Sequence, residues 1–295
     1  PRSRFCNSQM NGISEHFELD LGLLPPVSGT STDFVYMPGT SVDDQWNGVW
    51  GLLREYKGVR SDLLALPSNT DGRAPRTNFN SVIGSDGVAP RSAPLRNYDV
   101  TAVRAADALA GGKLSYNAGN GLNDPTALLY VLTADLDASG KLKPGVPVEP
   151  LILRANAGDH LVVTLRNGFK ALPTDAVGFN FWPPILDHFN ANQVVPSREV
   201  GLHPQLVAFD VAKANGVNAG LNAVSTVRAG QSITYHWYAG TVVIDERTGA
   251  ITATPVEFGA TNLMPADTLK HSNKGLVGAL IIEPGQGFGT GQHPS

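Results

Sequence analysis

The sequence predicts an all-β protein in which short strands pack as a sandwich. The chain has 295 residues, among them 32 Gly and 21 Pro, and few stretches keep a helical period for more than two turns. Runs of alternating apolar and polar residues recur instead between turn residues, which is the pattern of strands with one buried face. Such strands bury their apolar faces against each other in layers, so a β-sandwich is the expected architecture.

The clearest strand patterns occupy five segments. These are residues 150–155 (PLILRA), 160–167 (HLVVTLRN), 205–211 (QLVAFDV), 232–240 (SITYHWYAG) and 276–284 (LVGALIIEP). Residues 156–159 (NAGD) form a glycine-containing connection of the type that joins antiparallel neighbours, which predicts a hairpin between the first two strands. Residues 124–132 (DPTALLYVL) are ambiguous, because Asp124 and Pro125 would suit the start of a helix while a strand is equally compatible.

Composition and charge argue against two classes of partner. The net charge is −4 and the Lys and Arg residues are scattered, so the sequence offers no basic stripe for nucleic acid or anionic lipid. The most apolar stretch, residues 275–284, is only strand-sized, so we expect no membrane span. The first residues lack an initiating Met and an apolar leader, and we expect that a signal peptide was removed or never lay on this piece. Charged residues make up only 16%, a profile that favours an extracellular or periplasmic protein.

We expect the chain to divide into four parts. Residues 66–95 are rich in Pro, Gly, Ser and Asn, as in a linker or a long surface connection. The predicted ranges are 1–60 for the C-terminal part of one domain, 61–97 for a linker, 98–286 for a second, nearly complete domain and 287–295 for a flexible tail. This division predicts that a preceding domain is represented by its end alone.

An internal similarity supports that division. Residues 33–56 and 257–284 each begin with an acidic-aromatic pair, continue through an Asp-containing loop and end in a Gly-X-X-Gly strand, GVWGLL in the first and GLVGAL in the second. Two such matches indicate a repeated domain type.

Four segments in order carry a resemblance to a known family. Residues 149–167, 200–211, 227–240 and 274–284 resemble the cupredoxin domains of multicopper oxidases, including the ceruloplasmin-like and large bacterial members. The family has a Gly-Asp strand ending in V-x-L-x-N, then a His-x-His strand, then a Y-x-W strand and last a GL-x-G-x-L strand. The resemblance implies a cupredoxin-like Greek-key β-sandwich or barrel over residues 98–286, with residues 1–60 as the end of a preceding copy.

The resemblance also implies copper, and His203 is the one candidate ligand that the matched positions supply. A trinuclear copper centre uses His-x-His strands, because alternate residues place both imidazoles on one face. Here His203 holds the first position, but Gln205 holds the second. Where the family has its other histidine pair, this sequence has Phe258 and Gly259, and His271 in the following loop does not restore the spacing.

The sequence also lacks the histidine and methionine ligands of a mononuclear blue copper site at the positions that follow its cysteine. That site needs a Cys thiolate with two imidazoles, usually with an axial Met. The chain has one cysteine, Cys6, which excludes an internal disulfide, and the positions that should carry its companion ligands hold Asn7, Asn11 and His16. In the N-terminal copy, Tyr36 stands where a ligand of the other site could be.

The histidines of the matched region have alternative interpretations. His203 is either a retained copper ligand or a strand histidine whose ring binds a nearby carbonyl or water. Alternation places His236 on the face opposite Tyr235 and Trp237, which predicts a sheet-face residue. His160, next to a turn, is expected to be exposed to solvent.

Two further motifs favour structural roles. Residues 135–146 match the first ligand positions of a calcium-binding EF-hand loop, but Val146 replaces the final Glu, so a polar hairpin turn is the better interpretation. The aromatic residues could suggest a carbohydrate-binding platform, although packing within the fold explains them equally well. They are Trp46, Trp50, Trp182, Trp237 and Tyr238.

Two functions therefore remain from the sequence. In the first, the chain is a segment of a multicopper oxidase-like protein and serves mainly as scaffold and domain interface. Its partners would be other cupredoxin domains of the same protein or further chains, which would carry the copper that oxidises a reducing substrate and reduces dioxygen. In the second, it is a copper-free structural or binding module, since fold alone does not dictate function.

Overall fold

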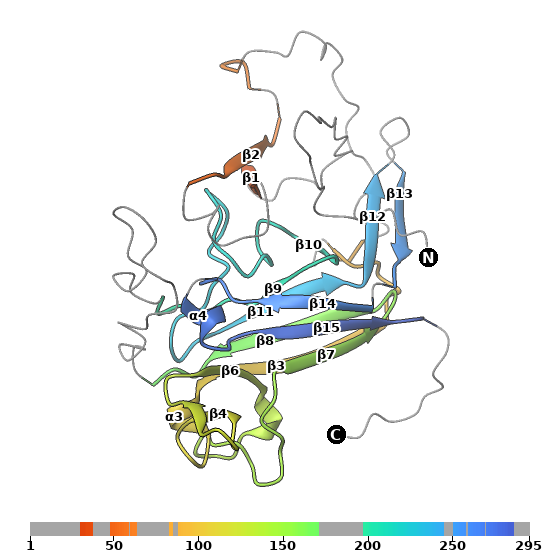
Figure 1. The fold of residues 1–295 in the computed structure, drawn as a ribbon. Helices are drawn as coiled ribbons and strands as arrows, with labels where there is room; N and C mark the ends of the chain where they lie inside the picture. The colour runs from red at the N-terminus through yellow and green to blue at the C-terminus, as the bar shows by residue number, and fades with distance from the viewer. Residues whose placement is uncertain are drawn as a thin grey trace, which may run out of the picture.

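The computed structural model describes most of the C-terminal two thirds of the chain and parts of the N-terminal third (Figure 1). The described residues are 30–37, 48–58, 60–63, 83–84, 88–170, 197–244, 250–257, 259–268 and 270–285. Within these ranges no helix combines the length and the apolar character needed to cross a membrane.

One main sheet has five strands in the order β10-β11-β8-β3-β6. Its strands are β3 (Leu95–Arg104), β6 (Leu128–Leu132), β8 (His160–Asn167), β10 (Ala208–Phe209) and β11 (Ser232–Tyr238). Neighbours run antiparallel except for β3 and β8, which are parallel over eight register pairs.

The other main sheet has four strands in the order β7-β15-β14-β9. Its strands are β7 (Leu151–Asn156), β9 (His203–Pro204), β14 (Gly259–Met264) and β15 (Gly278–Glu283). Strands β7 and β15 are parallel, and the remaining neighbours are antiparallel. Both sheets therefore join segments that are far apart in the sequence.

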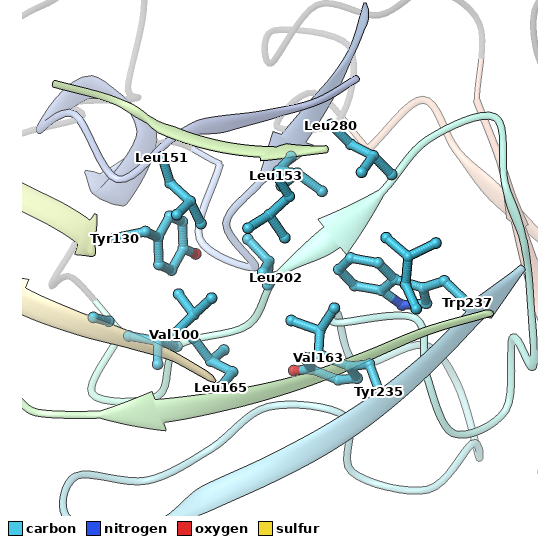
Figure 2. Packing of buried hydrophobic residues seen from close by; sticks show 14 of the residues in the cluster. Val100, Tyr130, Leu151, Leu153, Val163, Leu165, Leu202, Tyr235, Trp237 and Leu280 are labelled. Atoms are coloured by element: carbon cyan, nitrogen blue, oxygen red, sulfur yellow. The ribbon is translucent and has the colours of Figure 1, made fainter. Parts of the chain in front are cut away.

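The two sheets pack against each other around one apolar core (Figure 2). Strand β7 alternates buried and exposed side chains, so Leu151 and Leu153 point inward, into the same buried cluster as Leu165 of the opposing sheet. The polar atoms of the core residues Tyr130, Tyr235 and Trp237 have backbone partners, as burial requires. For example, the Tyr235 hydroxyl donates to the Ser225 carbonyl at 2.7 Å. The all-β sandwich expected from the sequence is confirmed.

Smaller elements surround the sandwich. Hairpins are formed by β4 (Leu114–Asn117) with β5 (Leu122–Asp124), β12 (Gly240–Ile244) with β13 (Ile251–Pro255), and β1 (Ser31–Tyr36) with β2 (Gly51–Tyr56). The described helices are short: α3 (Ala105–Ala108), the 3-10 turn η1 (Thr133–Asp135) and α4 (Lys270–Asn273).

The hairpin predicted at residues 156–159 is wrong, because β7 and β8 belong to different sheets. The connection crosses from one sheet to the other, and its amides bond to both. The N–H of Ala157 donates to the Glu283 carbonyl at the end of β15, and the N–H of Gly158 donates to the Ala239 carbonyl just after β11. The glycine-containing turn was predicted correctly. Its two flanking strands, however, pair with strands distant in the sequence and not with each other.

Two other expected elements differ from the structure. Only Ala208–Phe209 of the strand predicted at 205–211 pairs in a sheet, because Leu206 adopts a φ of 61°, outside the β region. A helix at 124–132 is excluded, since these residues include strand β6. Asp124 accepts bonds from the backbone and hydroxyl of Thr126, and it also pairs with the buried Lys274 ammonium at 3.1 Å.

The predicted repeat appears as two antiparallel strand pairs with the same register. In β1–β2, Tyr36 pairs with Gly51, and in β14–β15, Leu263 pairs with Gly278. Each residue of the second pair lies 227 positions after its counterpart (278 − 51 and 263 − 36). The first glycine of each Gly-X-X-Gly motif has a positive φ, 76° at Gly48 and 93° at Gly275.

The acidic-aromatic part of the repeat is wrong, because the shared register matches Asp33 with Ala260 and not with Glu257. Asp33 is instead fully buried and holds the β1–β2 hairpin on the sandwich. Its carboxylate accepts bonds from Arg54 Nε at 2.6 Å and Nη2 at 2.9 Å, and from the Leu221 N–H at 2.6 Å. The Arg54 guanidinium is the main cause that lowers the pKa of Asp33, although burial opposes it.

Backbone bonds to Asn222 complete this attachment. The Asn222 side chain accepts from the Asp33 N–H and donates to the Asp33 carbonyl, both at 2.8 Å. Gly220 allows the close approach, since a Cβ there would lie 1.9 Å from Asp33 Oδ2. The hairpin is therefore fixed to the loop that follows β10.

The predicted domain boundaries remain predictions. Strand β3 begins at Leu95, within the range expected as linker, and Ile83 and Pro90 of that range form an isolated bridge. The expected tail at 287–295 and residues 1–29 and 64–82 lie outside the described residues.

Candidate functional site

His203 lies on β9, at the edge of the four-stranded sheet, and pairs with Met264 of β14. Its Nδ1 lies 2.7 Å from the Asn215 carbonyl, so this nitrogen carries a proton and donates. Burial lowers the pKa of His203 below its usual value, and the ring meets Phe209 edge-on with centroids 5.8 Å apart. His203 is thus a neutral, oriented imidazole, and its Nε2 is the nitrogen left to bind a metal.

No companion ligands gather around His203 in the described ranges. Among these residues, no three His, Cys, Asp or Glu side chains form a group that could hold a metal ion. If His203 has only a structural role, its ring should bind a nearby carbonyl or water, and the Asn215 carbonyl is such a partner. Gly259 is exposed in β14, while Cys6, Asn7, Asn11, His16 and Phe258 lie outside the described residues.

His271 is a fully buried histidine of α4 and belongs to a separate environment. Its Nε2 lies 3.0 Å from the Ser197 carbonyl, and its ring meets Phe169 edge-on. Burial lowers the pKa of His271, with Asp267 opposing that shift. Its Nδ1 is buried and finds no partner among the described residues.

Two histidines of the five-stranded sheet meet directly, which the sequence did not predict. His160 of β8 and His236 of β11 face each other with 3.0 Å between His160 Nε2 and His236 Nδ1. His236 lies opposite Tyr235 and Trp237, on the face of the sheet away from the core, as alternation predicted. The expectation that His160 is exposed is wrong, since its exposed fraction is 8%.

The strand register explains this meeting. Strands β8 and β11 are antiparallel, with His160 paired to Tyr238 and His236 paired to Val162. The two histidines are therefore diagonal neighbours on one face, within reach of aromatic side chains. Sequence alternation alone could have put both on an outward face, but only the register brings them together.

The loop at 135–146 is a polar turn closed by its own side chains. Asp137 Oδ1 accepts bonds from the Ser139 N–H and hydroxyl and from the Lys141 N–H at 2.7–3.0 Å. The Lys143 ammonium donates to the Ala134 carbonyl at 2.6 Å. These contacts hold the hairpin turn that the sequence favoured over a calcium loop.

The aromatic residues do not form a common surface where they are described. Trp237 is fully buried and stacks on Tyr235 with centroids 5.9 Å apart, and Tyr238 is buried in a small cluster with Val88. Trp50 is 51% exposed on the β1–β2 hairpin. Trp46 and Trp182 lie outside the described residues.

Solved copper proteins are similar to this chain. They include a multicopper oxidase from Pseudomonas thermotolerans (16% identity, TM-score 0.38, 67% of this chain and 32% of that chain). They also include a copper nitrite reductase from Nitrosomonas europaea (12%, 0.36, 65% and 42%) and a laccase from Botrytis aclada (13%, 0.35, 70% and 24%). The chain spans less than half of each of these structures. No protein-family model matches, and no curated protein matches.

The fold assignment rests on the strands themselves. The cupredoxin-like architecture that the sequence resemblance implied agrees with the two packed sheets and with the order of the four matched segments. It also agrees with the antiparallel pairing of the Gly-X-X-Gly strand β15 with β14. These features identify the scaffold as cupredoxin-like.

Proposed function

We propose that this chain is a scaffold and domain-interface segment of a multicopper oxidase-like protein. Copper-bearing cupredoxin domains elsewhere in that protein would take single electrons from a reducing substrate and reduce dioxygen. The observation that carries the proposal is the β1–β2 hairpin. It repeats the register of β14–β15, but in the described residues it lacks the neighbouring strands that β14–β15 has.

The two strand pairs differ in what covers their apolar side chains. Leu263 and Leu280 of β14–β15 are fully buried in the sandwich core. Their counterparts on the hairpin, Tyr36 and Leu53, are 64% and 39% exposed. Other large apolar side chains near the hairpin tip are exposed as well, and a cluster of this kind marks an interaction surface. They are Val35, Met37, Val49, Trp50 and Leu52.

The second copy indicates what fits this surface. Strand β15 has the parallel strand β7 on its outer edge, and β14 has β9 on its outer edge. In the described residues, the sheet of β1 and β2 contains these two strands alone. The fitting partner is therefore the rest of a preceding cupredoxin-like copy, with a β7-like strand along β2 and an opposing sheet over Leu53.

Copper in this chain would involve His203 as a contributing ligand at most. Coordination would have to use Nε2, because Nδ1 bonds to Asn215, but copper centres need several converging ligands, and the described residues supply no such group at β9. Replacement of His203 by Ala in the intact source protein lowers the copper content if His203 is a ligand. Unchanged copper content excludes that role.

The proposal is tested by comparing this chain alone with the intact source protein, whose length is first established by mass spectrometry. The source protein should show blue absorption and oxidase activity, and the chain alone should show neither. Hydrogen exchange should be slow at the β2 amides in the source protein and faster in the chain alone, because the neighbouring strand is present only in the former. Equal exchange in both samples, or oxidase activity of the chain alone, contradicts the proposal.

The second candidate is a copper-free structural or binding module. It is favoured by the absence, within the described ranges, of any group of three metal-ligating side chains. A source protein without copper and without oxidase activity, but with the same slow exchange at β2, would support this alternative. For either function we propose an extracellular or periplasmic location.

A further inference from the structure

The His160–His236 pair brings two imidazole nitrogens nearly as close together as two ligands of one metal ion. The facing nitrogens are 3.0 Å apart, and the ring planes are tilted by 40°. Zinc–imidazole bonds of about 2.0–2.1 Å at a tetrahedral angle place two nitrogens roughly 3.3 Å apart. To accept one ion, the two rings would have to move apart by a few tenths of an ångström and turn so that both lone pairs converge on it.

The protein holds both rings on rigid elements. Strands β8 and β11 lie side by side and pair over seven residues, from Ser232 with Arg166 to Tyr238 with His160 (Figure 1). The His160 N–H also donates to the Pro94 carbonyl at 2.7 Å. Ligands on paired strands keep their separation better than ligands on loops.

We propose that His160 and His236 bind a divalent late transition-metal ion, with Cu²⁺ bound most tightly. One of these two nitrogens donates to the other, and metal binding requires that this proton leave the contact so that both lone pairs can face the ion. The site is distinct from His203, which lies on β9 in the other sheet.

The class of metal follows from the ligand set. Imidazole nitrogen suits Cu, Ni and Zn, and affinity for such ligands increases from Ni²⁺ to Cu²⁺ and is lower for Zn²⁺ than for Cu²⁺. With two protein ligands, water or another small ligand would fill the remaining positions. No thiolate takes part, so bound Cu²⁺ would lack the strong blue absorption of a copper–cysteine site.

Titration of the whole chain with Cu²⁺ in a non-coordinating buffer tests the site, followed by calorimetry and electron paramagnetic resonance. We expect one tightest site whose spectrum shows two nitrogen donors. His236→Gln and His160→Gln should each weaken that site by at least about tenfold, because loss of even a supporting partner of a metal ligand costs roughly 10–100-fold.

His203→Gln is the matched control and should leave the affinity of the tightest site unchanged. Circular dichroism and thermal unfolding establish that each variant is folded. His236 is only half-buried, so His236→Gln decides the outcome if His160→Gln fails to fold. Wild-type affinity in folded His236→Gln, or loss of the tightest site in His203→Gln, overturns the proposal. Neither result bears on the proposed oxidase assembly, because the readout is Cu²⁺ binding to this chain alone.

Discussion

Strand pairs β1–β2 and β14–β15 share a register and a pair of glycines, yet they lie in opposite environments. Leu280 of β15 is fully buried between two sheets, whereas its counterpart Leu53 of β2 is 39% exposed. The register comes from residues within each pair, while burial comes from neighbouring strands. A local strand pattern can therefore persist where the described residues provide no core to cover it.

The largest expected effect is at the matched leucines. Leu280→Ala should destabilise the isolated chain by about 3 kcal/mol, because it leaves a cavity in a closed core. Leu53→Ala, the matched control, should change the free energy of unfolding by less than about 0.5 kcal/mol. Denaturant unfolding measures both. Equal losses would mean that the hairpin is already part of a complete core, and would break the comparison.

The attachment of the hairpin gives the next largest effect. Asp33→Asn removes a buried carboxylate that accepts three hydrogen bonds from Arg54 and Leu221, and should weaken docking by about 2 kcal/mol. Hydrogen exchange at the Leu221 amide and along β1–β2 measures the opening. The matching residue in the other pair is the exposed Ala260, so Ala260→Asn should leave exchange unchanged.

The same contact predicts an acid dependence. The pKa of Asp33 is lower in the folded protein than in the unfolded chain, chiefly because of its bond to Arg54. The stabilisation is therefore complete above the unfolded pKa of about 3.9 and is lost as the pH falls through the folded value. Exchange at the Leu221 amide should accelerate in that acidic window after correction for intrinsic rates, and Asp33→Asn should abolish this pH-dependent change.

Alanine at the second glycine of each Gly-X-X-Gly motif should also have a different effect on stability in β1–β2 and in β14–β15. A Cβ at Gly278 would lie 2.9 Å from the Leu151 carbonyl of β7, so Gly278→Ala should cost about 1.5 kcal/mol. The atoms nearest to a Cβ at Gly51 belong to the Tyr36 ring, which is exposed and can move aside, so Gly51→Ala should cost less. Thermal unfolding compares the two, and a larger loss for Gly51→Ala would contradict this account.

The smallest expected effect is one that both copies share. Gly48 and Gly275 have positive φ, so alanine at either position should cost about 1 kcal/mol in local stability through backbone strain. Hydrogen exchange in β2 and β15 reports the two losses separately. A loss at Gly275 alone would show that the Gly48 turn is not a conformational equivalent.

Much of the fold could be predicted because alternation is a local signal. The patterns of β7, β8, β11 and β15 were visible in the sequence, and so was the outward face of His236. The pairing of β7 with β15 was not visible, because a parallel pair forms between distant segments and leaves no mark in a short window. The break at Leu206 was not visible either, because its backbone leaves the β region although its apolar side chain suits a strand.

The candidate site was predicted less completely for the same reason. His203 became a candidate through its place in a motif and remains a prediction as a ligand, while its Asn215 partner fits the structural interpretation. His160 was misjudged because it stands next to a turn, whereas β3 and β11 flank it on both sides in the sheet. A pair such as His160 with His236 becomes visible only when the register of two strands is known.

The parallel pairing of β7 with β15 has a consequence for biosynthesis. Leu151 pairs with Gly278, which follows it by 127 residues (278 − 151), so β7 leaves the ribosome well before its partner strand exists. At 5–20 residues per second, that interval is roughly 6–25 s. During this time the backbone edge of β7 can bind another nascent chain or a chaperone. The period of greatest aggregation risk therefore falls during translation, before the four-stranded sheet can close.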